Sequence, residues 1–181
     1  MLIILIAIIA LLVIWGISVQ NTLVKADETC NNALKQINVQ QVSRFDAIQA
    51  LVKLTREYSQ YESETLQKVI EARGGMISKP NPTVEDIAHN ESILSEISSK
   101  LIAIAEAYPD LKANEQYAKT MEQITRYEEN VRLARMTFND TVTRYNNQVR
   151  MFPGSIVAKI LGFFKKEYLA EDTTKVEYPQ I

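Results

Sequence analysis

The side chains that could do chemistry are few, and the most reactive types occur once each. The chain of 181 residues has one histidine, His89, and one cysteine, Cys30. Asp86 and His89 lie one turn apart on a predicted helix, so a symmetric oligomer could bring two such pairs to one metal ion. The usual di-iron centre of a helical bundle needs two Glu-x-x-His motifs, which one histidine cannot supply. We therefore interpret His89 as a solvated residue on a helix face and expect no metal and no cofactor.

Cys30 and the glycines also fail to form a familiar site. A single cysteine excludes an intramolecular disulfide and a cysteine-rich zinc site. We interpret Cys30 as a small residue on a helix face; the alternatives are a reactive thiol and an intermolecular disulfide. Gly74 and Gly75 close a predicted helix and so do not form a phosphate-binding loop. The net charge is −2 with basic and acidic residues intermixed, so we expect no nucleic-acid partner.

Four charged residues stand where the helical pattern calls for apolar ones: Arg44, Glu62, Glu128 and Arg135. A buried charge needs an opposite charge beside it, so each predicts a partner on a neighbouring helix. Such pairs fix the register of helices more than they add net stability. The alternatives are exposure at the rim of the bundle and a role in holding a ligand. We take the register-setting role as the prediction.

The elements that must position these residues begin with an apolar segment. Residues 1–17 contain no charged side chain and span about 26 Å as a helix, which Ser18 and Val19 extend. No basic residue precedes the run, unlike in a signal peptide, and Trp15 lies near its end, where an interfacial indole is expected. We predict a transmembrane anchor over residues 1–19, against the alternatives of a removed signal and a core helix. Lys25 and Lys35 favour the cytoplasmic side for the rest of the chain.

A very long helix is predicted directly after the anchor. Residues 18–73 contain neither Pro nor Gly, and apolar residues recur at steps of three and four. A second helix begins at the predicted N-cap Thr83 and runs to about Ala107. A third helix, capped by Asn114, extends through about Arg150.

The fold class that follows is all-α. We predict a transmembrane helix that continues into an elongated antiparallel bundle of three long helices plus one short C-terminal helix. The bundle covers residues 20–169, and a disordered tail covers residues 170–181. The first helix would be about 84 Å long and the second about 38 Å, so residues 18–40 form a stalk whose apolar stripe lacks cover. A second copy of the chain would cover it, which predicts a homo-oligomer.

The short helix, from Ser155 to about Phe164, is apolar and basic and resembles a membrane-surface element. If three helices alternate in direction, however, the third ends at Phe152, about 55 Å along and far from the anchor. We therefore expect the short helix at the distal tip, packed on the bundle or in contact with a partner or neighbouring subunit. The interface candidates there are Phe152, Pro153, Gly162 and Phe163.

Short motifs in one order along the chain resemble those of LemA family membrane proteins. The best match is Tyr108-Pro109-Asp110-Leu111-Lys112-Ala113-Asn114, similar to the family's Tyr-Pro-Glu-Leu-Lys-Ala-Asn. Weaker matches are Asn21-Thr22-Leu23-Val24, the stretch from Ser43 to Val52, Glu71-Ala72-Arg73, Ala134-Arg135, Phe138-Asn139, Tyr145-Asn146, Phe152-Pro153 and Gly162-Phe163. Gln49 and Ala50 replace a Pro-Asn of the family, so we expect a straighter first helix here.

The resemblance implies a bacterial membrane protein built on an antiparallel helical bundle, and it implies no reaction. We expect a membrane-anchored scaffold or interaction protein in the bacterial cytoplasmic membrane, in contact with lipid through its first helix and with an unidentified protein partner. The alternatives are an envelope-remodelling component of spanin type and an enzyme that uses carboxylates and a metal in the bundle.

Overall fold

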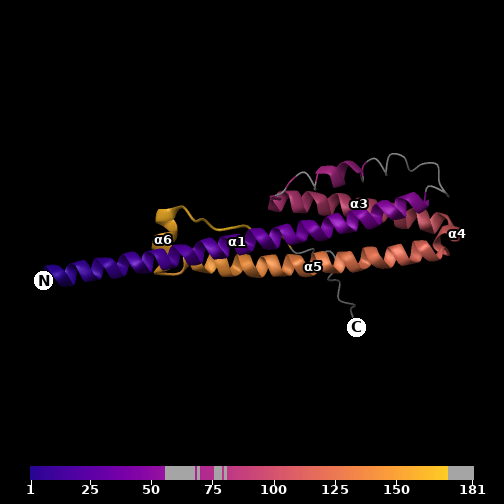
Figure 1. Cartoon of the computed structure of the whole chain (residues 1–181). Coiled ribbons are helices and arrows are strands. Elements are labelled where there is room, and N and C mark those ends of the chain that lie inside the picture. The colour runs from indigo at the N-terminus through magenta and orange to yellow at the C-terminus, as the bar shows by residue number, and fades with distance from the viewer. Residues whose placement is uncertain (56–67, 69, 76–78, 80, 171–181) are drawn as a thin grey trace, which may run out of the picture.

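The computed structural model describes residues 1–55, 68, 70–75, 79 and 81–170, and within them the chain is helical with no strand (Figure 1). The all-α prediction is thus confirmed. The helices are α1 (Leu2–Thr55), α3 (Val84–Ala107), α4 (Pro109–Lys112), α5 (Glu115–Arg150) and α6 (Gly154–Leu161).

Helix α1 joins the apolar segment to the bundle without a break. Its large apolar side chains from Met1 to Ile17 are all at least 38% exposed, and the most apolar window has a mean hydropathy of 3.1. By length and composition this part of the helix is able to cross a membrane. The helix also continues through Gln49 and Ala50, as expected where proline is replaced.

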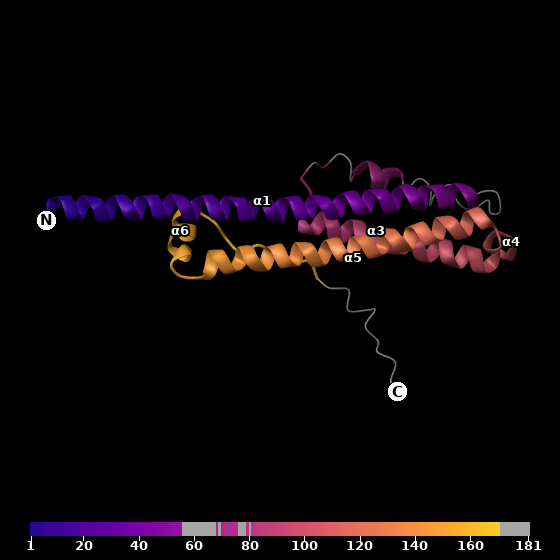
Figure 2. The same ribbon diagram turned by 60° about the horizontal axis from the view of Figure 1, so that its bottom comes forward.

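Helix α3 runs parallel to α1, and α5 runs antiparallel to both. Gln41 of α1 contacts Ile87 of α3, and Arg44 contacts Glu91, so residue numbers rise together along this pair. Along α1 and α5 the numbers run in opposite senses, because Arg44 pairs with Glu128 while Val19 lies near Gly154. Figure 2 shows that most of the length of α5 lies beside α1.

The prediction of one helix from residue 18 to residue 73 is wrong. A straight helix would separate Asp46 from Arg73 by about 40 Å. In the structure, Nε of Arg73 lies 2.5 Å from Oδ1 of Asp46, so the chain has reversed between Thr55 and Arg73. Residues 56–67, with the predicted seam residue Glu62, lie outside the described residues. This additional reversal sends α3 away from the anchor and brings α5 back toward it.

The core divides into two clusters along the rod. The far cluster packs α1, α3, α4 and the start of α5, and includes Phe45, Ile48, Leu94, Leu101 and Leu111. The near cluster, closer to the anchor, packs α1 chiefly against α5, and includes Cys30, Ala33, Leu34, Ile37, Val131, Phe138, Val142 and Tyr145. Helix α5 therefore covers the apolar stripe of residues 18–40, and the prediction of an uncovered stalk is wrong. Self-association stays a prediction, now without that physical reason.

The predicted helix caps form as expected. Thr83 Oγ1 accepts a hydrogen bond from the Asp86 amide at 3.2 Å, and the Thr83 amide donates to Asp86 Oδ2 at 3.0 Å. The hydrogen bond from Lys79 lowers the pKa of the Asp86 carboxyl, and the bond from the Thr83 amide lowers it further. Asn114 Oδ1 accepts from the amides of Gln116 at 2.8 Å and Tyr117 at 3.2 Å. These caps fix where α3 and α5 begin.

Candidate functional site

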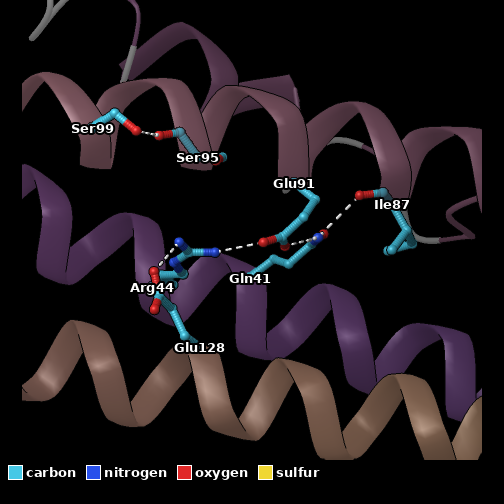
Figure 3. Close-up of polar contacts among 7 residues, drawn as sticks. All are labelled: Gln41, Arg44, Ile87, Glu91, Ser95, Ser99 and Glu128. Atoms are coloured by element: carbon cyan, nitrogen blue, oxygen red, sulfur yellow. Dashed lines mark hydrogen bonds and ion pairs between the residues drawn. The ribbon is translucent and has the colours of Figure 1, made fainter. Parts of the chain in front are cut away.

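A polar cluster joins the three long helices in the middle of the rod. Arg44 of α1 is 3% exposed; its Nη1 donates to Oε1 of Glu91 on α3 at 2.8 Å, and its Nη2 pairs with Glu128 on α5. Gln41 donates through Nε2 to the Ile87 carbonyl at 3.0 Å and to Glu91 Oε2 at 3.2 Å. Figure 3 shows Arg44 between the two carboxylates. We call these four residues, Gln41, Arg44, Glu91 and Glu128, the polar cluster.

The polar cluster suits a structural role better than a chemical one. One guanidinium faces two carboxylates that are themselves 22% and 33% exposed, so the three charges engage one another at the edge of the core. The predicted partners of Arg44 and Glu128 on neighbouring helices are present. A one-residue slip of any helix would part these groups, and their role in setting the register stays a prediction. Gln41 and Glu91 were missed, although Glu91 stands at three- and four-residue spacing between Leu94 and Ile87.

The other candidates for metal or thiol chemistry lie apart from this cluster. His89 is exposed on α3. Within the described ranges, no group of three or more His, Cys, Asp or Glu side chains could hold a metal ion. Cys30 is fully buried in the near cluster, and burial raises the pKa of its thiol above the ordinary value. A buried, neutral thiol agrees with the interpretation of Cys30 as a small packing residue.

A C-terminal strap, residues 163–170, runs back along the bundle and is held by two asparagines of α5. Asn146 donates from Nδ2 to the Lys166 carbonyl at 3.0 Å and accepts the Lys166 amide on Oδ1 at 2.9 Å. One heptad earlier, Asn139 makes the same pair of bonds with the carbonyl of Leu169 at 2.9 Å and its amide at 3.0 Å. Each side-chain amide thus satisfies one donor and one acceptor of the extended backbone, as a neighbouring strand would.

The strap also ties α5 to α1 through its side chains. Leu169 is 3% exposed in the near cluster. Lys166 Nζ lies 3.0 Å from Asp27 Oδ1 and 3.0 Å from Asn31 Oδ1, and 5.6 Å from the centre of the Tyr145 ring. Burial raises the pKa of the Tyr145 hydroxyl, and the Asp27 charge raises it further. The strap therefore closes the side of the near cluster.

Arg135 meets this strap. It is half-buried and donates a hydrogen bond to the Ala170 carbonyl. The sequence predicted a partner on a neighbouring helix and gave no sign of the strap. The predicted disordered tail lies outside the described residues from position 171 onward.

The interface candidates lie at the near end of the rod, so the prediction of a distal position is wrong. Trp15, Ser18, Val19 and Thr22 of α1 line a groove together with Asn147, Met151, Phe152 and Gly154. The physical reason is the reversal after Thr55, which reverses the direction of α5. The prediction that the short helix packs on the bundle is confirmed, because α6 contacts α1 and α5 and its Ala158 is 1% exposed.

Gly162 ends α6 and starts the strap. Its φ of 77° and ψ of 25° are in the left-handed region, and the amides of Gly162 and Phe163 both donate to the Ala158 carbonyl. The half-buried Phe163 then packs against the near cluster, whereas Phe152 and Pro153 are exposed. Gly162 therefore turns the chain from α6 into the strap, so that Phe163 packs against the near cluster while Phe152, before α6, stays exposed.

We expect Gly162→Ala to lower the free energy of unfolding by about 1 kcal/mol, because a Cβ disfavours the left-handed conformation. Urea unfolding of the detergent-solubilised chain, followed by circular dichroism, measures this. Gly74→Ala is the matched control: Gly74 is helical, has open space around it and lacks a positive φ, so alanine there is neutral or stabilising. Equal effects of the two substitutions would contradict the role of Gly162.

The sequence was compared with known protein families. Residues 33–181 match the LemA family, which is more than half of the chain. The chain belongs to the LemA family. The LemA match includes the polar cluster, both strap asparagines, α6 and the strap, whereas the apolar part of α1 precedes it.

This LemA chain is similar to bacterial proteins named as magnetosome proteins. MamQ 2 of Paramagnetospirillum magneticum is 28% identical over 72 residues, which is 40% of this chain and 26% of the relative. MamQ of Magnetospirillum gryphiswaldense is 31% identical over 85 residues, which is 45% of this chain and 31% of the relative. The match thus covers less than a third of either relative. With the apolar helix, these bacterial relatives indicate a bacterial membrane protein.

The structure explains why the motif pairs Phe138-Asn139 and Tyr145-Asn146 each combine an aromatic residue with an asparagine. In each pair the aromatic ring enters the near cluster and the adjacent asparagine holds the strap. The signal that could have revealed this is the repetition of an aromatic-asparagine pair one heptad apart on α5.

Proposed function

We propose that this LemA chain is a membrane-anchored helical scaffold that carries a protein-binding end away from the bilayer on its cytoplasmic side. The observation that carries the proposal is the continuity of α1, which passes from the apolar segment into the bundle core as one helix of 54 residues. A partner bound to the bundle would therefore be coupled mechanically to the anchor. No reaction is part of the proposal.

The rod has a defined length and is packed along that length. From Ser18 to Thr55, α1 extends about 55 Å beyond the apolar segment. Over that length the near cluster, the polar cluster and the far cluster follow one another, each packing α1 against at least one other helix. Such a body holds its far end at a fixed distance from the membrane, which is what a scaffold requires.

The far end offers a rigid and partly apolar surface. Leu111 is fully buried in the far cluster and holds the turn that joins α3 to α5. Around it, Tyr108 is 40% exposed and Ile102 is 46% exposed, beside the exposed Asp110 and Lys112. Tyrosine is enriched among the residues that contribute most to protein–protein binding, so Tyr108 on this turn favours the far end as the protein-binding surface. This turn is also the chain's best-matched LemA motif.

We expect a photoreactive amino acid placed at Lys112 to form a crosslinked adduct of discrete mass in cells, with several-fold higher yield than one placed at Arg132 on the exposed side of α5. Tyr108→Ala should abolish the Lys112 adduct, because the partner would lose its aromatic contact. Immunoblotting of the tagged chain measures both yields.

Two results would contradict the proposal. Adducts of equal yield from Lys112 and Arg132 would indicate random encounters along the rod. A Lys112 adduct that survives Tyr108→Ala would show that the exposed turn does not select the partner. Circular dichroism of the Tyr108→Ala chain controls for folding, since Tyr108 lies outside the core.

A further inference from the structure

The near end of the rod exposes a group of large apolar side chains that no described residue covers. Phe152 is 80% exposed, Ile160 and Phe164 are each 76% exposed, and Ile156 is 51% exposed. Ile156 and Ile160 are four residues apart and so lie on the same side of α6, and Phe152 and Phe164 flank the two ends of the helix. We call these four residues, together with Met151 and Leu161, the membrane-end surface. Exposed apolar groups of this size in one place indicate a contact with something other than water.

The membrane-end surface lies beside the part of α1 where the apolar segment ends. The groove beside it is lined by Trp15, Ser18 and Val19, and the uncharged apolar run ends at Ile17. Figures 1 and 2 both show α6 lying crosswise to α1 at this level, at the end of α5. If α1 crosses the bilayer, a helix crosswise to it lies along the membrane plane.

The segment that carries the membrane-end surface is basic. From Arg150 to Lys166 the chain carries four basic residues and no acidic one. Lys166 is engaged by Asp27, whereas Arg150, Lys159 and Lys165 are exposed. Long basic side chains beside apolar ones at the level of the lipid headgroups let the apolar parts enter the bilayer while the charges meet phosphate.

We propose that the membrane-end surface docks into the headgroup region of the bilayer that α1 crosses, with its basic residues on anionic phospholipid. The chain then holds the membrane at two points, α1 and α6, which fixes the angle of the rod. Helix α6 is itself fixed to the rod by the buried Ala158 and by the strap that follows Gly162. This inference concerns the near end and is independent of what binds the far end.

The test uses the full chain with Ile160→Cys, labelled with the fluorophore nitrobenzoxadiazole, in vesicles of phosphatidylcholine with and without phosphatidylglycerol. Lys112→Cys at the far end is the matched control, and the buried Cys30 of the parent chain should take up no label. We expect the label at position 160 to emit at shorter wavelength and several-fold more strongly than at position 112. A spin-labelled lipid should quench it, aqueous iodide should not, and phosphatidylglycerol should strengthen the effect.

The same experiment has outcomes that overturn the proposal. Identical emission and iodide quenching at positions 160 and 112 would show a surface in water. Shielding that disappears when the chain is diluted at constant lipid would show that a second copy covers the surface. Failure of this test leaves the far-end crosslinks unaffected, so the two proposals can fail separately.

Reversing the charge of the exposed lysines tests whether they bind anionic lipid. Lys159→Glu with Lys165→Glu should remove the phosphatidylglycerol dependence of a label at position 160, whereas Lys112→Glu should leave it unchanged. An unchanged dependence in the double variant would contradict the role of these lysines. Both lysines are exposed, and circular dichroism checks that the helices are retained.

Discussion

We expect Arg44→Ala to lower the free energy of unfolding by about 3 kcal/mol, because it leaves two carboxylates facing each other at the centre of the rod without their shared cation. Both carboxylates are partly exposed, at 22% and 33%, so water offsets some of the cost and the value stays at the lower end for a broken buried pair. Gln41 also loses its ordered neighbour, since it shares Glu91 with Arg44. Urea unfolding of the detergent-solubilised chain measures the loss.

Arg126→Ala is the matched control for this prediction. Arg126 pairs with Glu122 on the surface of α5, where the two side chains are 74% and 63% exposed, and exposed pairs of this kind contribute between zero and about 1 kcal/mol. Equal losses from Arg44→Ala and Arg126→Ala would show that the polar cluster does not join the helices. Arg44→Met with Glu91→Gln and Glu128→Gln separates the charges from the packing: it should recover much of the loss, because no uncompensated charge is left.

We expect the double substitution Asn139→Ala and Asn146→Ala to detach the strap and to lower the free energy of unfolding by about 4 kcal/mol, from four hydrogen bonds whose net contribution is roughly 1 kcal/mol each. The amides of Lys166 and Leu169 lose their acceptors, so their hydrogen exchange should accelerate at least tenfold. Mass spectrometry of peptides that cover residues 163–170 measures this. Cys30 should also become reactive toward alkylating agents, since Leu169 shares the near cluster with it.

Asn147→Ala is the control within the same helix turn. Asn147 is exposed and next to Asn146, but the strap contacts are made by Asn146 and Asn139. Its substitution should leave strap exchange and Cys30 reactivity unchanged. If the double variant exchanged at the rate of the Asn147→Ala chain, the two asparagines would not be what holds the strap.

The polar cluster and the strap lie in different parts of one rod. The polar cluster contacts α1, α3 and α5, and we predict that it sets their register; the strap closes the near cluster beside the membrane end. The proposed scaffold needs the polar cluster, because its far end must be held in a fixed position. The proposed docking of α6 on the membrane needs the strap, because the strap holds the residues that follow Gly162. Loss of the strap should therefore reduce lipid shielding at position 160 while leaving far-end crosslinks in place.

The local features of this protein were predictable from the sequence because they depend on residues within one or two turns. The apolar run, the caps at Thr83 and Asn114, and the helix breaks at Pro109 and Pro153 all follow from side-chain chemistry close by in the chain. The anomalous charges Arg44 and Glu128 were also visible, since a charge at a seam position needs a partner wherever it is.

The tertiary structure alone decided the direction of the helices and hence what lies at each end. Residues 18–73 hold no Pro or Gly, so nothing local marks the reversal that brings Arg73 back to Asp46. That reversal is favoured by packing, because it lets α3 and α5 both bury their apolar faces on α1. It also moves Phe152 and α6 from the predicted distal tip to the membrane end. Periodicity shows which face of a helix is buried, but the sense in which two faces meet depends on contacts between residues far apart in the chain.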